Sequence, residues 1–389
     1  MNKQDLRELA SDLLRSANIT LNGTNPWDIQ ILNQDFYQRV FSQGSLGLGE
    51  AYIDHWWDCD RLDIFFEKII KADLESKIKT RKWVLIKLLL ARFLNMQTKK
   101  RAWIVGRKHY DLGNDLYSCM LDTRMNYTCG YWRNANTLDE AQKNKLELTC
   151  QKLKLKSGMR LLDIGCGFGA LAKYAAKHYG VSVVGITISR EQQEYAKQNC
   201  AGLPVEIRLQ DYRDLNEKFD RIASLGMFEH VGQLNYRAYM QIARNCLTDD
   251  GIFLLHTIGN NVSTTAANEW INKYIFPNGM LPSITQIGKA SEGLFVMEDW
   301  ENFGAYYDKT LMAWFANFDK HWEQLKNKYD DRFYRMWSYY LLSCAGMFRA
   351  RATQLWQIVF SKQGITGGYH PPLRELKSGN EASIEVIGF

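Results

Sequence analysis

The chain has 389 residues, of which 46% are hydrophobic and 13% are aromatic, and its formal net charge is +6. This composition is ample for a packed core, and the length allows two or three domains. The chain contains only six prolines, which favours long helices and argues against a loop-rich β fold.

The amino terminus and the cysteines bear on the compartment. The start of the chain, MNKQDLRELASDLLRS, mixes charges into a helical pattern and lacks the apolar core of a secretory signal. No stretch reaches the roughly 18 apolar residues that a membrane-spanning helix needs. The eight cysteines are scattered without a C-x-x-C pair, so we expect neither a disulfide framework nor a metal site. We therefore expect a cytosolic, reduced protein.

The first unit that we predict along the chain covers residues 1–76. It has helical patterns and an aromatic cluster, GEAYIDHWWDCDRLDIFF, at residues 49–66. We expect it to form a small, mostly helical domain.

A basic segment follows and is predicted as a linker helix over residues 77–105. Between Lys77 and Lys108 there are eleven Lys or Arg residues and no Asp or Glu. Apolar residues alternate with this charge, so the helix can lie on an anionic membrane, link two domains or bind nucleic acid. No helix-turn-helix or RNP pattern supports the last of these. The candidate membrane-binding residues are Lys82, Lys87, Arg92, Lys99, Lys100 and Arg101.

From about residue 159, strand and helix patterns alternate. We predict strands at 159–165, 181–187, 205–209, 219–225 and 251–259, and helices at 170–180, 189–200 and 233–247. This alternation predicts an α/β fold with a doubly wound, mostly parallel sheet. Residues 260–345 are predicted to be mostly helical, residues 353–361 to form a late strand, and residues 362–389 to form a mobile tail. The catalytic domain would span residues 106–361.

A glycine-rich turn indicates the ligand. LLDIGCGFGAL places Asp163, Gly165, Gly167 and Gly169 between a strand and a helix. A dinucleotide site needs an acidic residue about 20 positions further on, and the strand VVGITIS ends without one. An S-adenosylmethionine (SAM) site has an acidic residue before the glycines and another after the third strand, which LQDYRD supplies as Asp211. We therefore predict a SAM site, with a glycine turn that binds no ligand as the alternative.

The stretch after the fourth strand restricts the kinds of molecule that could accept the methyl group. The sequence SLGMFEHVG places Glu229 beside His230 there, and it has no counterpart of the N/D-P-P-Y stretch of amino methyltransferases. The next strand adds His256. A lone histidine at a strand end is often a core residue, but the Glu229–His230 pair nearby favours a ligand site for His256.

Taken together, these stretches resemble the cyclopropane-fatty-acyl-phospholipid synthase family. The resemblance covers residues from about 27 to 361 and is carried by GSLGLGEAYID, KKRAWIVGRKHYDLGNDLY, MNYTCGYW, LLDIGCGFG, VVGITIS, QDYRDL, GMFEHVG, FLLHTIG, WINKYIFPNG, YYDKTLMAW and CAGMFRAR. It implies a Rossmann-like class I SAM-dependent methyltransferase fold with helical insertions and a smaller amino-terminal lipid-binding domain.

The resemblance also implies an activity and its residues. The SAM methyl group would be transferred to a cis double bond of an acyl chain in a membrane phospholipid, and a bound bicarbonate would take the proton that ring closure releases. Bicarbonate would contact Cys129, Glu229, His256, Tyr307 and the backbone of Ile258. SAM would contact Tyr127, Thr128, Gly165, Gly167, Thr187, Gln192, Asp211 and Tyr212. Cys344 matches a cysteine suspected of catalysis in the family, although this chemistry needs no thiol and a packing role is favoured. For His230, structural support is favoured.

Partners and alternatives complete the expectations. The resemblance implies a homodimer that binds the inner face of an anionic cytoplasmic membrane peripherally and does not bind nucleic acid. A related enzyme that leaves a methyl branch or a hydroxylated methyl group on the same chain stays open. A SAM- and lipid-binding module without activity is a third reading, and the presence of Glu229, His256 and Tyr307 argues against it.

Overall fold

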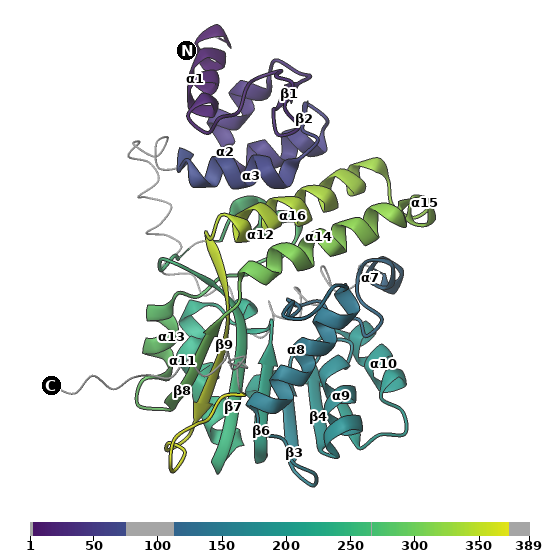
Figure 1. Cartoon of the computed structure of the whole chain (residues 1–389), viewed down its shortest axis with the longest axis vertical. Coiled ribbons are helices and arrows are strands. Elements are labelled where there is room, and N and C mark those ends of the chain that lie inside the picture. Colours follow the sequence, from purple (N-terminus) through teal and green to yellow (C-terminus); the bar gives the residue numbers. More distant parts are fainter. Residues whose placement is uncertain (1–2, 75–112, 266, 373–389) are drawn as a thin grey trace, which may run out of the picture.

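The computed structural model describes residues 3–74, 113–265 and 267–372. Figure 1 shows two parts: a group of amino-terminal helices at one end and a twisted sheet with flanking helices at the other. The candidate membrane-binding residues between positions 82 and 101 lie outside the described residues, as do residues 373–389. None of the described helices has both the length and the apolar character that crossing a membrane requires.

The central sheet has seven strands in the order β5-β4-β3-β6-β7-β9-β8. Their bounds are β3 (Arg160–Ile164), β4 (Ser182–Thr187), β5 (Val205–Leu209), β6 (Phe219–Leu225), β7 (Leu247–Asn260), β8 (Val296–Asn302) and β9 (Thr353–Ser361). The strands from β5 to β7 pair in parallel, whereas β9 is antiparallel to both β7 and β8. The predicted mostly parallel α/β sheet is confirmed.

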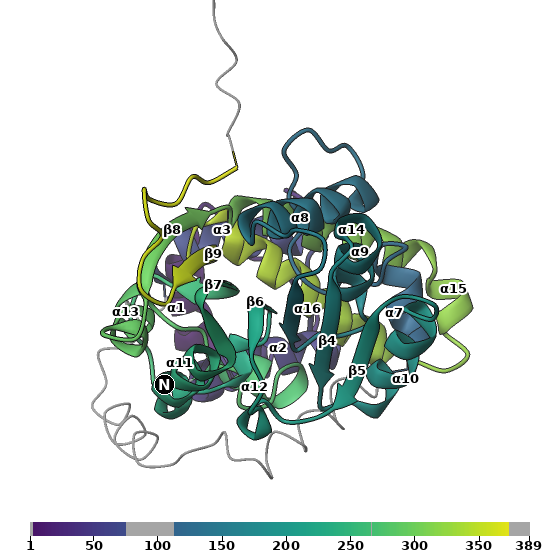
Figure 2. The same ribbon diagram turned by 90° about the horizontal axis from the view of Figure 1, so that it is seen from below.

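Helices cover both faces of this sheet. They are α8 (Leu138–Lys152), α9 (Ala170–Tyr179), α10 (Arg190–Asn199), α11 (Tyr236–Cys246) and α13 (Ile284–Ser291). Figure 2 shows α8 and α9 on one side of the strands and α11 on the other. Buried apolar strand residues such as Leu162, Ile222 and Phe253 fill the space between the layers.

Residues at the end of α9 and at the start of α10 cap these two helices. Gly180 ends α9 in the left-handed region at φ 65°, as a glycine C-cap does. The Ser189 side chain accepts the backbone N–H of Gln192 and so starts α10. Gln192 does not complete a capping box with Ser189, because its side chain accepts a hydrogen bond from Thr187 Oγ1 instead, at 2.9 Å.

Strand β8 was not predicted, because residues 260–345 read as mostly helical. Its sequence VMEDWEN contains three acidic residues, which strands disfavour. The strand lies at the edge of the sheet, where Glu298 and Asp299 remain partly exposed, so burial did not impose an apolar alternation. Strand β7 also begins at Leu247, before its predicted start.

The remaining elements form the helical part above the sheet. They are α1 (Lys3–Arg15), β1 (Gln30–Ile31), α2 (Phe36–Ile53), β2 (Trp57–Asp58), α3 (Leu62–Lys71), α7 (Asn114–Met120), α12 (Glu269–Tyr274), α14 (Ala305–Lys320), α15 (Trp322–Leu325) and α16 (Asp331–Arg349). Short 3-10 turns follow two strands of the sheet, at Tyr212–Asp214 after β5 and at Phe228–His230 and Gln233–Asn235 after β6. The expected helical amino-terminal region is therefore present as α1 to α3.

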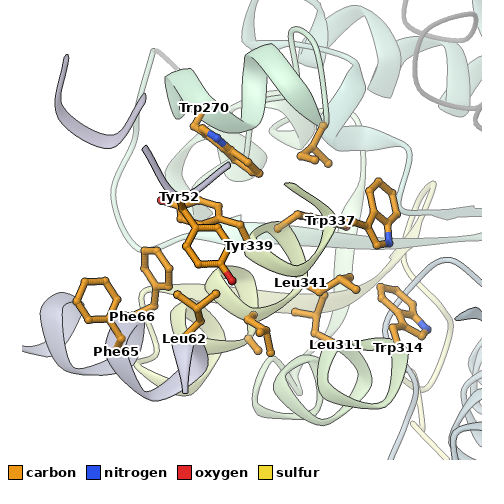
Figure 3. Close-up of a cluster of buried hydrophobic side chains, with 14 of the residues drawn as sticks. Tyr52, Leu62, Phe65, Phe66, Trp270, Leu311, Trp314, Trp337, Tyr339 and Leu341 are labelled. Carbon is orange, nitrogen blue, oxygen red and sulfur yellow. The ribbon is translucent and has the colours of Figure 1, made fainter. Parts of the chain in front are cut away.

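The amino-terminal helices are joined to the sheet part by an aromatic core and by ion pairs. Figure 3 shows Tyr52 and Phe66 against Tyr339 of α16, with ring centroids 5.5 and 5.2 Å from that ring. Nearby, Arg349 Nη1 contacts the buried Asp63 of α3 at 2.7 Å, and the same guanidinium binds both carboxylate oxygens of Asp308. Helices α3, α14 and α16 are thus held by one guanidinium.

The first part of the predicted mobile tail packs against the sheet. The Tyr369 ring is buried, and its hydroxyl donates to the carbonyl oxygen of Lys152 at 2.8 Å. The Ile365 N–H donates to the Glu298 carboxylate at 2.9 Å. The expectation of mobility therefore does not hold for residues 362–372, because an aromatic side chain anchors them.

Candidate functional site

A cavity of about 160 Å³ lies where strands β3, β4, β5 and β6 end. The carboxyl ends of parallel strands are the usual place for a ligand in such a sheet. The predicted SAM residues that line this cavity are Tyr127, Thr128, Asp163, Gly165, Gly167, Thr187, Gln192, Asp211 and Tyr212. The structure thus brings together residues from four strand ends and from the segment before α8.

The glycine turn forms one wall of this cavity. Gly165 and Gly167 have φ values of 79° and 53°, in the left-handed region that favours glycine. Gly169 also has positive φ, but it does not line the cavity. A Cβ there would approach Ala196 to 3.0 Å, so this glycine allows α9 to pack closely against α10.

Two buried ionisable residues, Asp163 and Lys145, line the cavity and affect each other's pKa. Asp163 is buried, and burial raises the pKa of its carboxyl to about 7, although the nearby Lys145 opposes this rise. Burial also lowers the pKa of the Lys145 ammonium to about 8. Among the described residues, Asp163 Oδ2 has no hydrogen-bond partner, so a ligand in the cavity could supply one.

Helix α8 fixes Thr128 from below. Lys145 Nζ donates to Thr128 Oγ1 at 3.0 Å and to Asn126 Oδ1 at 2.8 Å. Gln142 Nε2 donates to the Thr128 carbonyl oxygen at 2.7 Å. Since the hydroxyl oxygen accepts from Lys145, its own proton remains available to an acceptor in the cavity.

The sequence did not single out Lys145. A signal existed, because this lysine lies on the stripe that includes Leu138, Ala141, Leu146 and Thr149, which are buried at helical spacing. A lysine on a buried stripe needs specific partners, and that requirement could have identified it.

The far wall of the cavity carries polar groups that already have partners. Thr187 and Gln192 are hydrogen-bonded to each other, as described above. The Asp211 carboxylate accepts from the Arg213 guanidinium at 2.6 and 2.8 Å. A ligand hydroxyl that approached Asp211 would therefore meet a carboxylate already oriented by its neighbour.

Glu229 lies beyond the cavity wall, in the 3-10 turn after β6. Its Oε1 accepts the backbone N–H of Ile258 at 2.6 Å. Burial raises the pKa of the carboxyl to about 7 from an ordinary value of 4.5. Oε2 is buried and has no partner among the described residues. His230, next to it, is half-buried and lines the cavity, and desolvation lowers the pKa of its imidazole to about 4.

His256 lies two residues before Ile258 on β7, so both side chains leave the same face of the sheet. It is buried, and burial holds the pKa of the imidazole well below its ordinary value, with Lys145 and Lys152 adding to this effect. Nε2 is buried without a partner in the described part of the chain. Glu229 Oε2 and His256 Nε2 are thus both buried polar atoms without a hydrogen-bond partner among the described residues.

Tyr307 and Cys129 complete the predicted set. Burial raises the pKa of the Tyr307 phenol well above its ordinary value. Burial also raises the pKa of the Cys129 thiol. The thiol is 3.9 Å from Thr310 Oγ1 on α14, the helix that carries Tyr307. Glu229, His256, Tyr307 and Cys129 do not line the cavity itself.

Aromatic rings connect the cavity with this second group. The Tyr127 ring lies 5.1 Å from Trp314 and its hydroxyl is 2.9 Å from that of Tyr340. The Tyr307 ring lies 4.6 Å from Phe348 and 5.9 Å from Trp314. Aromatic faces of this kind stabilise a cation.

Cys344 lies on α16, and burial raises the pKa of its thiol to about 12. A thiol with that pKa is protonated at neutral pH and is a poor nucleophile. We expect Cys344→Ala to keep kcat within about threefold of the unchanged chain and to lower the free energy of unfolding by about 1 kcal/mol, because only a small, half-buried group is lost. Turnover and thermal unfolding measure the two effects. A kcat loss of about 100-fold or more would indicate that Cys344 takes part in catalysis.

Comparison with known proteins extends these observations. Residues 97–358 match the family described as mycolic acid cyclopropane synthetase. The chain is 56% identical over 360 residues to the cyclopropane-fatty-acyl-phospholipid synthase of Escherichia coli K12, which covers 92% of this chain and 94% of that protein. It is 35% identical over 279 residues to the sphingolipid C9-methyltransferase of Komagataella phaffii, covering 66% of this chain and 57% of that protein.

A solved structure agrees with the sequence matches. Mycolic acid cyclopropane synthase CmaA1, complexed with SAH and CTAB, superposes with a TM-score of 0.63 at 33% identity, covering 67% of this chain and 98% of that one. The family match spans more than half of the chain, and its bounds enclose the glycine turn, Glu229, His256 and Tyr307. The chain therefore belongs to the mycolic acid cyclopropane synthetase family and is a SAM-dependent methyltransferase of the cyclopropane fatty acid synthase type.

Proposed function

We propose that this protein converts the cis double bond of an acyl chain in a membrane phospholipid into a cyclopropane ring, with SAM as the source of the added carbon. The observation that carries the proposal is the buried Glu229 and His256 pair beside a SAM-type cavity. The identity to the Escherichia coli synthase supports the substrate class.

The groups that line the cavity suit SAM. The unpartnered Asp163 Oδ2 and the open backbone at Gly165 and Gly167 suit a small polar ligand that approaches the main chain closely. Thr128 would donate to the amino acid part of the ligand, and Asp211 would accept from its ribose. Bound there, SAM would supply an electrophilic methyl group on a sulfonium.

The chain's own residues would prepare the acceptor. An alkene is a weak nucleophile, so the reacting carbons must be held in line and kept from water. The buried rings of Tyr307 and Trp314 and the half-buried ring of Tyr127 would exclude water from the region between the two groups of residues. Their faces would also stabilise the positive charge that develops on the acyl chain.

Ring closure needs a base for one proton, and we propose bicarbonate for this role. The unused Glu229 Oε2 and His256 Nε2 are buried polar atoms that a small hydrogen-bonding ion would satisfy. Cys129, Tyr307 and the backbone of Ile258 would complete its surroundings. Glu229 would position the ion and would not itself be the base.

A second candidate is a methyltransferase that leaves a methyl branch or a hydroxylated methyl group on the same kind of chain. The 35% identity to a sphingolipid C9-methyltransferase favours considering it. Both reactions would begin with the same methyl transfer and differ in how the positive charge is lost. Only the product distinguishes them.

The proposal also includes docking to the inner face of an anionic cytoplasmic membrane, with a homodimer as the working assembly. We expect the triple change Lys99→Gln, Lys100→Gln and Arg101→Gln to weaken binding to anionic vesicles at low salt by up to about 100-fold, since each charge near the surface contributes on the order of 1 kcal/mol. Vesicle co-sedimentation measures the binding, and light scattering measures the assembly.

A matched control removes three exposed lysines elsewhere with the same change in net charge. It carries Lys177→Gln, Lys197→Gln and Lys320→Gln. Equal weakening by both triple variants would show that net charge alone acts, and unchanged binding by the first would return the basic segment to a linker role.

The central experiment incubates the protein with unsaturated phospholipid vesicles, bicarbonate and methyl-labelled SAM. Mass spectrometry and NMR of the lipids then identify the product. One added methylene with upfield ring protons in place of the alkene signal is expected. A methyl or hydroxyl product would move the assignment to the second candidate, and the absence of transfer would leave a binding role or a different acceptor.

A further inference from the structure

Gln357 of β9 contacts Nδ1 of His256, the ring nitrogen opposite the unpartnered Nε2. The side chain is fully buried, and its Nε2 lies 3.3 Å from His256 Nδ1 and 3.3 Å from Thr149 Oγ1. β9 pairs with β7 so that Gln357 stands directly opposite His256. The glutamine therefore links helix α8 to the imidazole.

The orientation of this amide follows from Thr149. The Thr149 hydroxyl donates its only proton to the carbonyl oxygen of Lys145, 2.8 Å away and one turn earlier in α8. Toward Gln357, the hydroxyl oxygen can then only accept. The amide atom that faces Thr149 must be the NH₂ group, because the amide oxygen has no proton to donate.

The amide orientation decides where the imidazole carries its proton. The same NH₂ group faces His256 Nδ1, so Nδ1 must accept and cannot carry a proton. A neutral imidazole then has its proton on Nε2, the atom that faces the site without a partner among the described residues. The buried position beside Lys145 and Lys152 keeps the pKa of His256 low and so favours this neutral ring.

We propose that Gln357 is a positioning residue that holds His256 as the Nε2–H tautomer, so that His256 donates a hydrogen bond into the site. His256 then acts on an oxygen atom of a bound anion or substrate as a donor, and it cannot take a proton at Nε2. The tautomer assignment stands on this structure alone, whereas its use in turnover rests on the proposed function. The chain Lys145–Thr149–Gln357–His256 would thus set one hydrogen-bond direction in the site.

The test is ¹⁵N NMR of the histidine-labelled protein, which reports the proton on each ring nitrogen without any substrate. His256→Gln identifies the signals. We expect an unprotonated Nδ1 and a protonated Nε2 in the unchanged chain. A protonated Nδ1, or a ring protonated on both nitrogens at neutral pH, would overturn the proposal.

Two variants separate positioning from packing. Gln357→Glu places an acceptor opposite Nδ1 and should move the proton from Nε2 to Nδ1. Gln357→Leu removes the donor without adding a charge and should leave both tautomers populated. In each, kcat should fall by about 10- to 100-fold, with weaker apparent affinity for bicarbonate and KM for SAM within about twofold. If the ¹⁵N signals stay unchanged in folded Gln357→Leu, the proposal is wrong.

A control on the same strand is Gln354→Leu, which removes a buried glutamine that contacts Asn302 and the Arg351 carbonyl oxygen. It should leave the His256 signals unchanged, whatever it does to stability. If the unchanged chain shows the expected tautomer but transfers no methyl group to unsaturated phospholipid, the proposed function fails and the role of Gln357 in setting the tautomer stands.

Discussion

Glu229→Gln should lower kcat by at least about 100-fold while changing the dissociation constant for SAM by less than about threefold. The substitution keeps the shape of the side chain, and its amide oxygen can still accept the Ile258 N–H. It replaces the unused Oε2 by an NH₂ group, so an ion or proton that needs a carboxylate oxygen there loses its partner. Glu229 does not line the cavity, which is why SAM binding should survive.

Calorimetric titration with SAM and initial rates on phospholipid vesicles measure the two quantities. The matched control is Glu292→Gln, which makes the same chemical change at an exposed position and should alter neither quantity. An equal loss of SAM binding and turnover in Glu229→Gln would contradict the division of the site into a SAM cavity and a separate proton-handling group.

The same variant should gain stability above neutral pH. Burial raises the pKa of Glu229 from 4.5 to about 7, so the folded protein holds this proton more tightly than the unfolded chain. The group's contribution to the free energy of unfolding therefore falls as pH rises from about 4.5 to about 7, and the deficit above pH 7 is at most about 3 kcal/mol. Urea unfolding at pH 8 should show Glu229→Gln to be more stable than the unchanged chain, and at pH 4 the difference should shrink.

Lys145→Met should lower the free energy of unfolding at pH 7.5 by about 3 to 5 kcal/mol, because removing one partner leaves buried carboxyl groups without a nearby cation. The fully buried ammonium donates to Thr128 and Asn126 and offsets the charges of Asp122 and Asp163. Methionine fills similar volume, so the loss would come from charge and hydrogen bonds and not from a cavity. SAM affinity should fall as well, because Thr128 loses its donor.

Urea unfolding of a double-mutant cycle measures this coupling. Combining Lys145→Met with Asp163→Asn should recover at least about 1 kcal/mol relative to the sum of the single changes, because the uncompensated carboxyl is then absent. Lys143→Met, on the exposed face of the same helix, is the control and should stay within about 0.5 kcal/mol. Strict additivity of the two changes would show that Lys145 and Asp163 do not interact.

The sequence predicted the sheet well wherever burial imposes an apolar pattern. β3, β4, β6 and β9 are buried strands bounded by glycine or turn residues, and their apolar sequences were sufficient to predict them. β8 escaped because an edge strand can expose acidic residues. The anchoring of Tyr369 escaped because a single aromatic residue among Gly and Pro has no periodicity from which burial can be inferred.

The parts of the candidate site differ in how far the sequence alone could predict them. The glycine turn and Asp211 follow from chemistry that requires those residue types at that spacing, and the structure places both in one cavity. The set around Glu229 came from the resemblance, and the roles of its members stay predictions. Gln357 could not be assigned from the sequence, because it acts through contacts between elements far apart in the chain, which join β9 to α8 and to β7.

The position of β9 has a consequence for how the chain is made. Among the strands that the structure describes, β9 is synthesised last, yet it lies inside the sheet between β7 and β8. Until it leaves the ribosome, β7 has an unpaired edge and β8 has no strand to pair with, and unpaired edges invite aggregation. Because β9 also supplies Gln357, which contacts His256, a nascent chain cannot complete the surroundings of His256 before β9 has been translated.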